Sequence, residues 1–147
     1  MALEAESVRL SDSTWTMAVP IRSEADVVNA RQSGRELAAV IGFNTIDQAL
    51  IATAISELAR NILKYAGDGE VVVRNRSVLG REGIEVVAAD HGPGIANLPD
   101  AMIDGVSTSG GLGLGLPGAK RLMDEFHVQT GSTGTTITCL KFMVAGA

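Results

Sequence analysis

Three polar side chains stand at helical spacing near the middle of the chain. Glu57, Asn61 and Lys64 are separated by four and three residues, so on a helix they share one narrow stripe. A carboxylate can act as a general base, an amide oxygen can ligate Mg²⁺, and an ammonium can contact a phosphate. Mg²⁺ often takes only one or two protein oxygens and fills its shell with water and substrate phosphates, so one amide is enough. The pattern fits phosphate chemistry; the alternative is an ordinary solvated helix face.

A further carboxylate, Asp90, stands where an apolar run ends and opens a loop of sequence DHGPGI at residues 90–95. A partly buried carboxylate at a strand end can accept a hydrogen bond from an exocyclic amine such as that of adenine. Gly92 and Gly94 would let a flat ring lie against the backbone. The alternative is a turn-forming Asp before Gly-Pro-Gly.

The third candidate segment is rich in glycine, with six glycines between Gly105 and Gly118. Residues 113–118 satisfy the pattern GxGxxG, but no strand precedes them and no acid follows about 20 residues later, so a dinucleotide fingerprint is excluded. The chain has no Gly-Lys-Ser or Gly-Lys-Thr, which excludes a Walker P-loop. Backbone N–H groups before a helix start still favour a phosphate site, and a surface loop is the alternative.

The surrounding sequence predicts the elements that position these candidates. A strand is expected at 14–21, a helix from Ser23 to Ile41 with Gly42 as its C-cap, and a second helix from 44 or 45 to about 66. The stripe that the second helix buries consists of Ile51, Ile55, Leu58 and Ile62. Strands at 70–78 and 83–89 should form a hairpin, followed by a helix at 117–126 and strands at 127–130 and 135–144. This order predicts helices packed on one face of a mostly antiparallel sheet.

Composition limits the class of protein. The 147 residues fit one domain. We divide them into an N-terminal extension at 1–11, for which flexibility is one interpretation, and a single domain at 12–147. Hydrophobic residues at 46% and charged residues at 20% argue against disorder. The net charge of −5 and the lack of a Lys/Arg run argue against a nucleic-acid binder. No signal peptide or membrane span is evident, so we expect a cytoplasmic protein without a membrane partner.

The remaining residues of reactive type have structural interpretations. Cys139 cannot form an internal disulfide in a chain with one cysteine, and we expect it to be a small buried residue of the last strand. His91 is a variable loop position, His127 lies in no motif, and Trp15 is interpreted as a packing residue.

Taken together, the motifs are similar to the N, G1 and G2 boxes of the GHKL superfamily. The matching patterns are ExxxN at 57–61, DxGxGI at 90–95 and GxGxG at 111–115, and Gly134-Thr135 resembles a further adenine-contacting motif. The resemblance covers residues 12–144. It implies the Bergerat ATP-binding fold, an α+β two-layer sandwich with helices on one face of a mostly antiparallel mixed sheet.

Residues 46–62 and 104–118, continued by KRLMDEF at 120–126, resemble more closely the RsbT-type switch-protein serine/threonine kinases of the bacterial stressosome. This resemblance implies a kinase that phosphorylates Ser or Thr on STAS-domain scaffold and antagonist proteins. After release, such a kinase binds and activates a downstream output protein, such as a PP2C-type phosphatase. A nucleotide-dependent sequestering module of the anti-sigma-factor type is the alternative. A bare ATPase is less favoured, because 147 residues leave no room for a transducer domain. Both a monomer and a homodimer are compatible with the composition.

The resemblance also implies roles for single residues. Glu57 would take the proton from the substrate serine or threonine, Asn61 would hold Mg²⁺, and Lys64 would lie near the phosphates. Asp90 would receive the adenine amine of ATP or ADP, and Thr135 would help directly or through water.

The glycine-rich segments would enclose the nucleotide. Gly92 and Gly94 would lie beneath the adenine ring, in the box that Ile95 completes. Residues from about 92 to 115 would form an ATP lid whose glycines permit opening and closing. The amides that wrap the phosphates would be those of Gly110, Gly111, Leu112, Gly113, Leu114 and Gly115.

Overall fold

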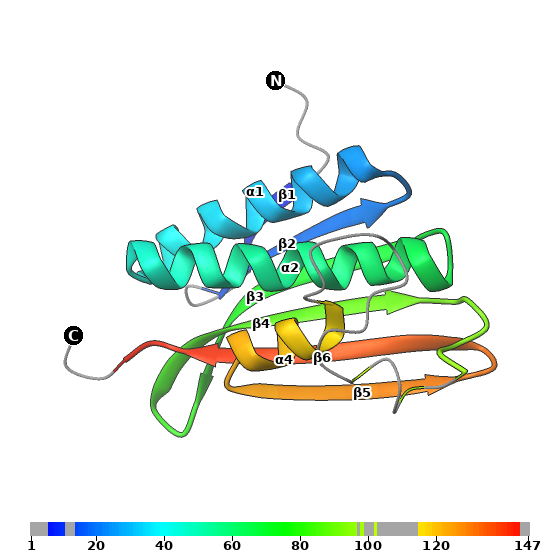
Figure 1. Cartoon of the computed structure of the whole chain (residues 1–147). Coiled ribbons are helices and arrows are strands. Elements are labelled where there is room, and N and C mark those ends of the chain that lie inside the picture. Colours follow the sequence, from blue (N-terminus) through cyan, green and yellow to red (C-terminus); the bar gives the residue numbers. More distant parts are fainter. Residues whose placement is uncertain (1–5, 11–13, 97, 99–101, 103–114, 145–147) are drawn as a thin grey trace.

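The computed structural model describes residues 6–10, 14–96, 98, 102 and 115–144. Six strands and three helices of this part carry labels (Figure 1). In chain order they are β1 (Glu6–Leu10), β2 (Thr14–Ile21), α1 (Glu24–Ile41), α2 (Thr45–Tyr65), β3 (Gly69–Val78), β4 (Arg81–Asp90), α4 (Gly115–Leu122), β5 (Glu125–Gly131) and β6 (Gly134–Phe142).

The strands form one sheet in the order β1-β2-β3-β4-β6-β5, and each neighbouring pair is antiparallel. The three helices lie on one face of this sheet, with α1 and α2 side by side and α4 over the β6 side (Figure 1). The predicted α+β two-layer architecture is confirmed. The expected mixture of parallel and antiparallel pairs is not found among the described strands, all of which pair antiparallel.

Sequence analysis predicted most of these elements within a few residues, with two differences. It predicted no strand before residue 14, whereas β1 pairs with β2 from Glu6↔Ala18 to Leu10↔Thr14. It also extended the last helix to Phe126, whereas α4 ends at Leu122. The reason is strand pairing, because Glu125 and Phe126 already lie in β5 opposite Leu140 and Cys139 of β6.

The two long helices begin and end where their capping residues predict. Ser23 Oγ accepts the Asp26 N–H at 3.4 Å, and Asn44 Oδ1 accepts the Asp47 N–H at 2.8 Å. Gly42 closes α1 with a φ of 122°, a conformation that favours glycine, and donates its N–H to Ala38 O. No helix among the described residues has the length and apolar character needed to cross a membrane.

The core lies between the helices and the sheet, and α2 is central to it. The predicted stripe of α2 is confirmed, with Ile51, Ile55 and Leu58 at 0% exposure and Ile62 at 1%. Helix α1 approaches α2 closely at Gly34, where an added Cβ would lie 2.2 Å from Ile55 Cδ1. The rotation of α2 about its axis is therefore fixed by packing on two sides.

We expect Ile55→Ala to lower the free energy of unfolding by about 3 kcal/mol, because it leaves a cavity between α1, α2 and the sheet. Ile46→Ala is the matched control on the same helix, since Ile46 is 73% exposed, and it should change stability by less than about 0.5 kcal/mol. Urea unfolding followed by circular dichroism measures both. Equal effects of the two substitutions would contradict the assigned packing of α2.

Candidate functional site

Asp90 lies at the last position of β4, on the helix-covered face of the sheet. It is 6% exposed, and its Oδ1 accepts the Gly92 N–H at 2.9 Å and the Thr135 N–H at 3.3 Å. The strand register places Asp90 directly between Gly69 of β3 and Thr135 of β6. These contacts hold the carboxylate in one orientation at the end of β4. The motif predicted this position at the end of a strand.

A pair of threonine hydroxyls extends this row of residues into β5. Thr135, at 2% exposure, lies opposite Thr130, and their Oγ1 atoms are 2.8 Å apart. Thr130 Oγ1 also accepts the N–H of Ile95 at 2.8 Å. Thr130 therefore connects the loop after β4 to the turn between β5 and β6. Sequence analysis missed this residue; the available signal was its position just before the Gly131–Gly134 turn, opposite Thr135.

The loop after β4 requires glycine at two positions for steric reasons. An added Cβ on Gly92 would lie 2.6 Å from Ala66 Cβ, next to the end of α2. Gly94 has a φ of 88°, and its added Cβ would lie 2.3 Å from Gly131 O. The loop therefore runs tightly between the end of α2 and the β5–β6 turn.

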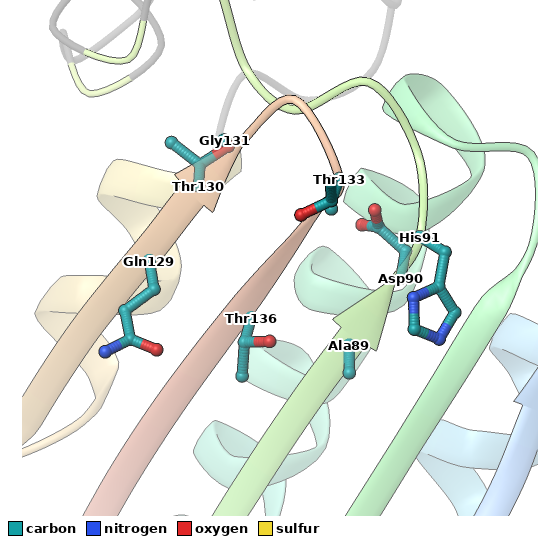
Figure 2. Close-up of a pocket in the computed structure, with 9 residues that line it drawn as sticks. Ala89, Asp90, His91, Gln129, Thr130, Gly131, Thr133 and Thr136 are labelled. Carbon is teal, nitrogen blue, oxygen red and sulfur yellow. The ribbon is translucent and has the colours of Figure 1, made fainter.

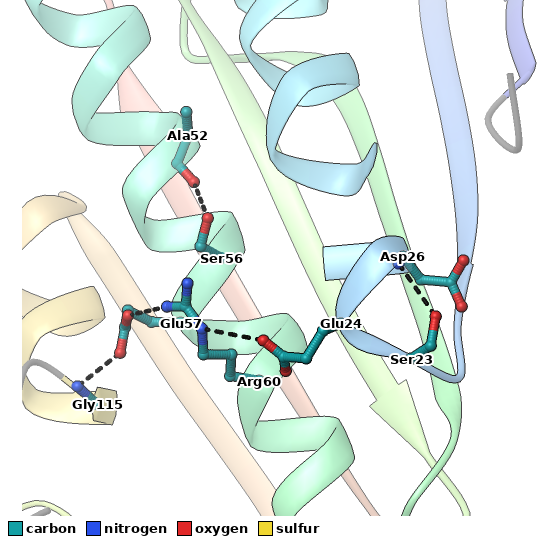
Figure 3. A network of polar contacts seen from close by, with 8 residues as sticks. All are labelled: Ser23, Glu24, Asp26, Ala52, Ser56, Glu57, Arg60 and Gly115. Atoms are coloured by element: carbon teal, nitrogen blue, oxygen red, sulfur yellow. Dashed lines mark hydrogen bonds and ion pairs between the residues drawn. The ribbon is translucent and has the colours of Figure 1, made fainter. Parts of the chain in front are cut away.

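The polar stripe of α2 lies beside its buried stripe, as the spacing predicted. Asn61 is 9% exposed, and the Glu57 side chain is 14% exposed. Glu57 Oε2 accepts the N–H of Gly115, the first residue of α4, at 2.8 Å, and Glu57 Oε1 is 2.7 Å from Arg60 Nη1 (Figure 3). Arg60 was not among the candidate residues; its signal was a charge of opposite sign three positions after Glu57.

Two further groups of predicted site residues remain. Lys64 is exposed, and its Nζ lies 5.2 Å from the centroid of the Tyr65 ring. Residues 110–114 lie outside the described residues, which leaves Gly115, with a φ of 51°, as the described member of the G2 segment.

Two further features bear on metal or thiol chemistry. Among the described residues, no group of three or more His, Cys, Asp or Glu side chains could hold a metal ion, so a metal there would depend on few protein ligands. Cys139 is buried, and desolvation raises the pKa of its thiol to about 12. The thiol therefore stays protonated at neutral pH, which agrees with a packing role.

A cavity of about 390 Å³ opens at the same end of the sheet, on the face away from the helices. Ala89, Gln129 and Thr136 line it from adjacent strands, and Figure 2 shows their side chains on the side opposite the helices. Asp90 and Thr130 also border it, but the register places them on the helix-covered face. The motif residues and this cavity therefore share a sheet end and lie mainly on different faces of it.

Comparison with known proteins shows the family and the fold of this chain. Residues 20–141 match the family described as Histidine kinase-like ATPase domain. The chain is 52% identical over 126 residues to the serine/threonine-protein kinase RsbT of Bacillus subtilis (strain 168), covering 85% of this chain and 95% of RsbT. The structure of the RsbU and RsbW domains of Rv1364c from Mycobacterium tuberculosis superposes with a TM-score of 0.58 at 22% identity, over 85% of this chain and 32% of that one.

The chain belongs to the histidine kinase-like ATPase domains, a class that binds a nucleotide. Within this class it belongs to the RsbT family, and it is a serine/threonine-protein kinase. The resemblance to GHKL proteins and to RsbT-type kinases, found in the sequence motifs, is thereby confirmed.

We expect Thr130→Val to raise the Kd for ATP about tenfold, because the buried N–H of Ile95 loses its acceptor and the loop loses its tie to the sheet. Thr130→Ser keeps the hydroxyl and should restore affinity. Thr136→Val is the matched control, since it removes a hydroxyl one strand away on the other face, and it should leave the Kd within twofold. Isothermal titration calorimetry measures all three. Weaker binding by Thr136→Val alone would instead place the nucleotide in the cavity of Figure 2.

Proposed function

We propose that this kinase transfers the γ-phosphoryl group of Mg-ATP to a serine or threonine of a STAS-domain scaffold or antagonist protein. After release from that complex, it binds and activates a downstream output protein such as a PP2C-type phosphatase. The observation that carries the proposal is the pairing of Glu57, on the edge of α2, with the backbone N–H of Gly115 at 2.8 Å. This contact puts a carboxylate at the start of the helix that follows the glycine-rich segment.

In this proposal the purine and the phosphates are held by different elements. The oriented carboxylate of Asp90 accepts the adenine amine, and Thr135 assists at its side. The backbone amides of residues 110–114 are the proposed donors to the phosphates, since the Gly115 N–H already donates to Glu57. A backbone amide cradle before a helix N-terminus suits an anionic group, because both supply positive partial charge.

The residues present also fit a magnesium ion. Asn61 offers one amide oxygen from a nearly buried position, at 9% exposure, and no cluster of acidic or imidazole ligands among the described residues competes with it. One protein oxygen, completed by water and phosphate oxygens, is a common Mg²⁺ arrangement. When bound, the ion neutralises negative charge on the phosphates during transfer.

Glu57 is the proposed general base. The hydroxyl oxygen of the substrate forms a bond to the γ-phosphorus, the bond from that phosphorus to the bridging oxygen of ADP breaks, and the hydroxyl proton passes to Glu57. Phosphoryl transfer demands mainly positioning and charge stabilisation from a protein, so this small set of side chains is sufficient.

The proposed substrate and output partner are supported by the family. RsbT matches over 95% of its length at 52% identity, so the compared segment is nearly the whole relative. Residues 46–62, which carry the proposed base and the proposed metal ligand, are part of the resemblance to RsbT-type kinases.

We expect Glu57→Gln to lower the rate of phosphotransfer at least 100-fold, because the amide cannot accept the hydroxyl proton. The Kd for ATP should stay within about threefold, as the substitution keeps the shape of the side chain. The measurement is intact-mass spectrometry of a STAS-domain protein incubated with Mg-ATP and each variant. Glu36→Gln is the control, since Glu36 is an exposed acid of α1 outside the network drawn in Figure 3.

Two outcomes would contradict this account. Retained transfer by Glu57→Gln would place the base elsewhere. The unmodified protein could instead transfer no phosphate and form a stable complex with the STAS-domain protein, which separates when nucleotide is added. In that case the chain acts as a sequestering module of the anti-sigma-factor type.

Asn61→Ala should remove the magnesium-dependent part of ATP binding, so that the Kd in Mg²⁺ rises about tenfold toward the value measured in EDTA. Asn61→Asp keeps an oxygen ligand and should retain a response to Mg²⁺. Calorimetric titrations with and without EDTA measure both variants. An unchanged Kd for Asn61→Ala in Mg²⁺ would show that Asn61 is not the metal ligand.

A further inference from the structure

The carboxylate of Glu57 is held at both of its oxygens by different parts of the fold (Figure 3). Arg60 Nη1 lies 2.7 Å from Oε1, and the Gly115 N–H lies 2.8 Å from Oε2. The two oxygens therefore differ: one faces along α2 toward Arg60, and the other faces the start of α4.

Arg60 is itself anchored from a third element. Its Nε lies 4.0 Å from Glu24 Oε1, in the first turn of α1, so the guanidinium bridges α1 and α2. The side chains differ in exposure, at 74% for Glu24, 50% for Arg60 and 14% for Glu57. The two ion pairs Glu24–Arg60 and Arg60–Glu57 thus lead from solvent toward the protected Glu57 carboxylate.

Stability alone is a weak explanation for this arrangement. Ion pairs that involve exposed side chains contribute little to folding, because water and salt screen them and two long side chains lose rotamer freedom. A glutamate near a reacting group has a different requirement. Its carboxylate must be held in one orientation, because small displacements of a catalytic group reduce rate strongly.

We propose that Arg60 is a positioning residue for phosphotransfer, which fixes Glu57 through Oε1. The hydroxyl proton is then accepted by Oε2, which keeps a second lone pair while it accepts the Gly115 N–H. This inference rests on the proposed role of Glu57 as the base. Arg60 acts through Glu57 and touches neither the nucleotide nor the substrate protein. Glu24 is a secondary anchor, because its 4.0 Å separation from Arg60 is long and it is largely exposed.

The guanidinium suits this task better than an ammonium. Its planar fork presents several N–H groups in fixed directions, so it can donate to Glu57 through Nη1 while Nε remains directed at Glu24. A lysine at the same position could reach one carboxylate as a point charge, but it could not bridge both in a fixed geometry.

The test compares Arg60→Met, Arg60→Lys and Glu24→Gln in steady-state phosphotransfer from Mg-ATP to the same STAS-domain protein. Arg60→Met keeps an unbranched apolar stem and removes the charged guanidinium, and it should lower kcat about tenfold or more while both KM values stay within twofold. The kcat of Arg60→Lys should be at least threefold higher than that of Arg60→Met. Glu24→Gln removes the weaker anchor and keeps the Arg60–Glu57 bond, so it should lower kcat by less than Arg60→Met does.

A melting curve for each variant serves as the folding control. We expect melting temperatures within about 3 °C of the unmodified protein, because the Arg60 guanidinium is half exposed and screened by water. Arg60→Lys keeps the inference testable if Arg60→Met fails to fold, since a lysine should preserve solubility and still show a reduced kcat.

An unchanged kcat for Arg60→Met would overturn the inference, as would a raised KM for the protein substrate with kcat unchanged, which would indicate direct substrate contact. Glu57→Gln in the same assay separates this result from the proposed function. If Glu57→Gln loses transfer and Arg60→Met does not, the base stands and the positioning role fails. If Glu57→Gln retains transfer, the base assignment fails first, and the inference fails with it.

Discussion

Helix α2 has to fill the core with one stripe of side chains and present polar groups with the adjacent stripe. Ile51, Ile55 and Leu58 are completely buried, so α2 cannot rotate about its axis without exposing them. Glu57 and Asn61 lie on the adjacent stripe of the same helix, so a rotation of α2 would move both of them together. The hydrophobic packing of α2 is the constraint on which the position of the proposed base and metal ligand depends.

The sheet supplies the second half of the site through its strand register. One row of residues on the helix-covered face crosses five strands, in the order Ile21, Gly69, Asp90, Thr135 and Thr130. Gly69 lets α2 approach this row, because an added Cβ there would lie 2.7 Å from Ile62 Cγ2 and 3.1 Å from Asp90 Cβ. Because Gly69 has no side chain, the end of α2 can lie close to Asp90.

Local sequence signals predicted a large part of this arrangement. The caps Ser23, Gly42 and Asn44 gave the limits of the two long helices, and isoleucine spacing gave the buried face of α2. Spacing on α2 also predicted that Glu57 and Asn61 share one stripe, since three or four residues separate neighbours on a helix. These features depend on interactions within a few positions of the chain, which is why they can be predicted from sequence.

Features that depend on distant contacts could not be predicted in the same way. Thr130 and Ile95 are separated by 35 positions, and only the folded sheet brings the hydroxyl to the amide. The short strand β1 has five residues and is defined by its pairing with β2. The contact between Glu57 and Gly115 spans 58 positions, so the pairing of this carboxylate with the start of a later helix has no local signature.

The central claim is that the nucleotide lies on the helix-covered face, between α2 and the end of β4. A crystal structure of the protein with Mg²⁺ and a non-hydrolysable ATP analogue tests it most directly. The account predicts the adenine amine within hydrogen-bonding distance of the Asp90 carboxylate and the metal ion bound to the side-chain oxygen of Asn61. A nucleotide seated instead against Ala89, Gln129 and Thr136, in the cavity on the opposite face, would contradict it.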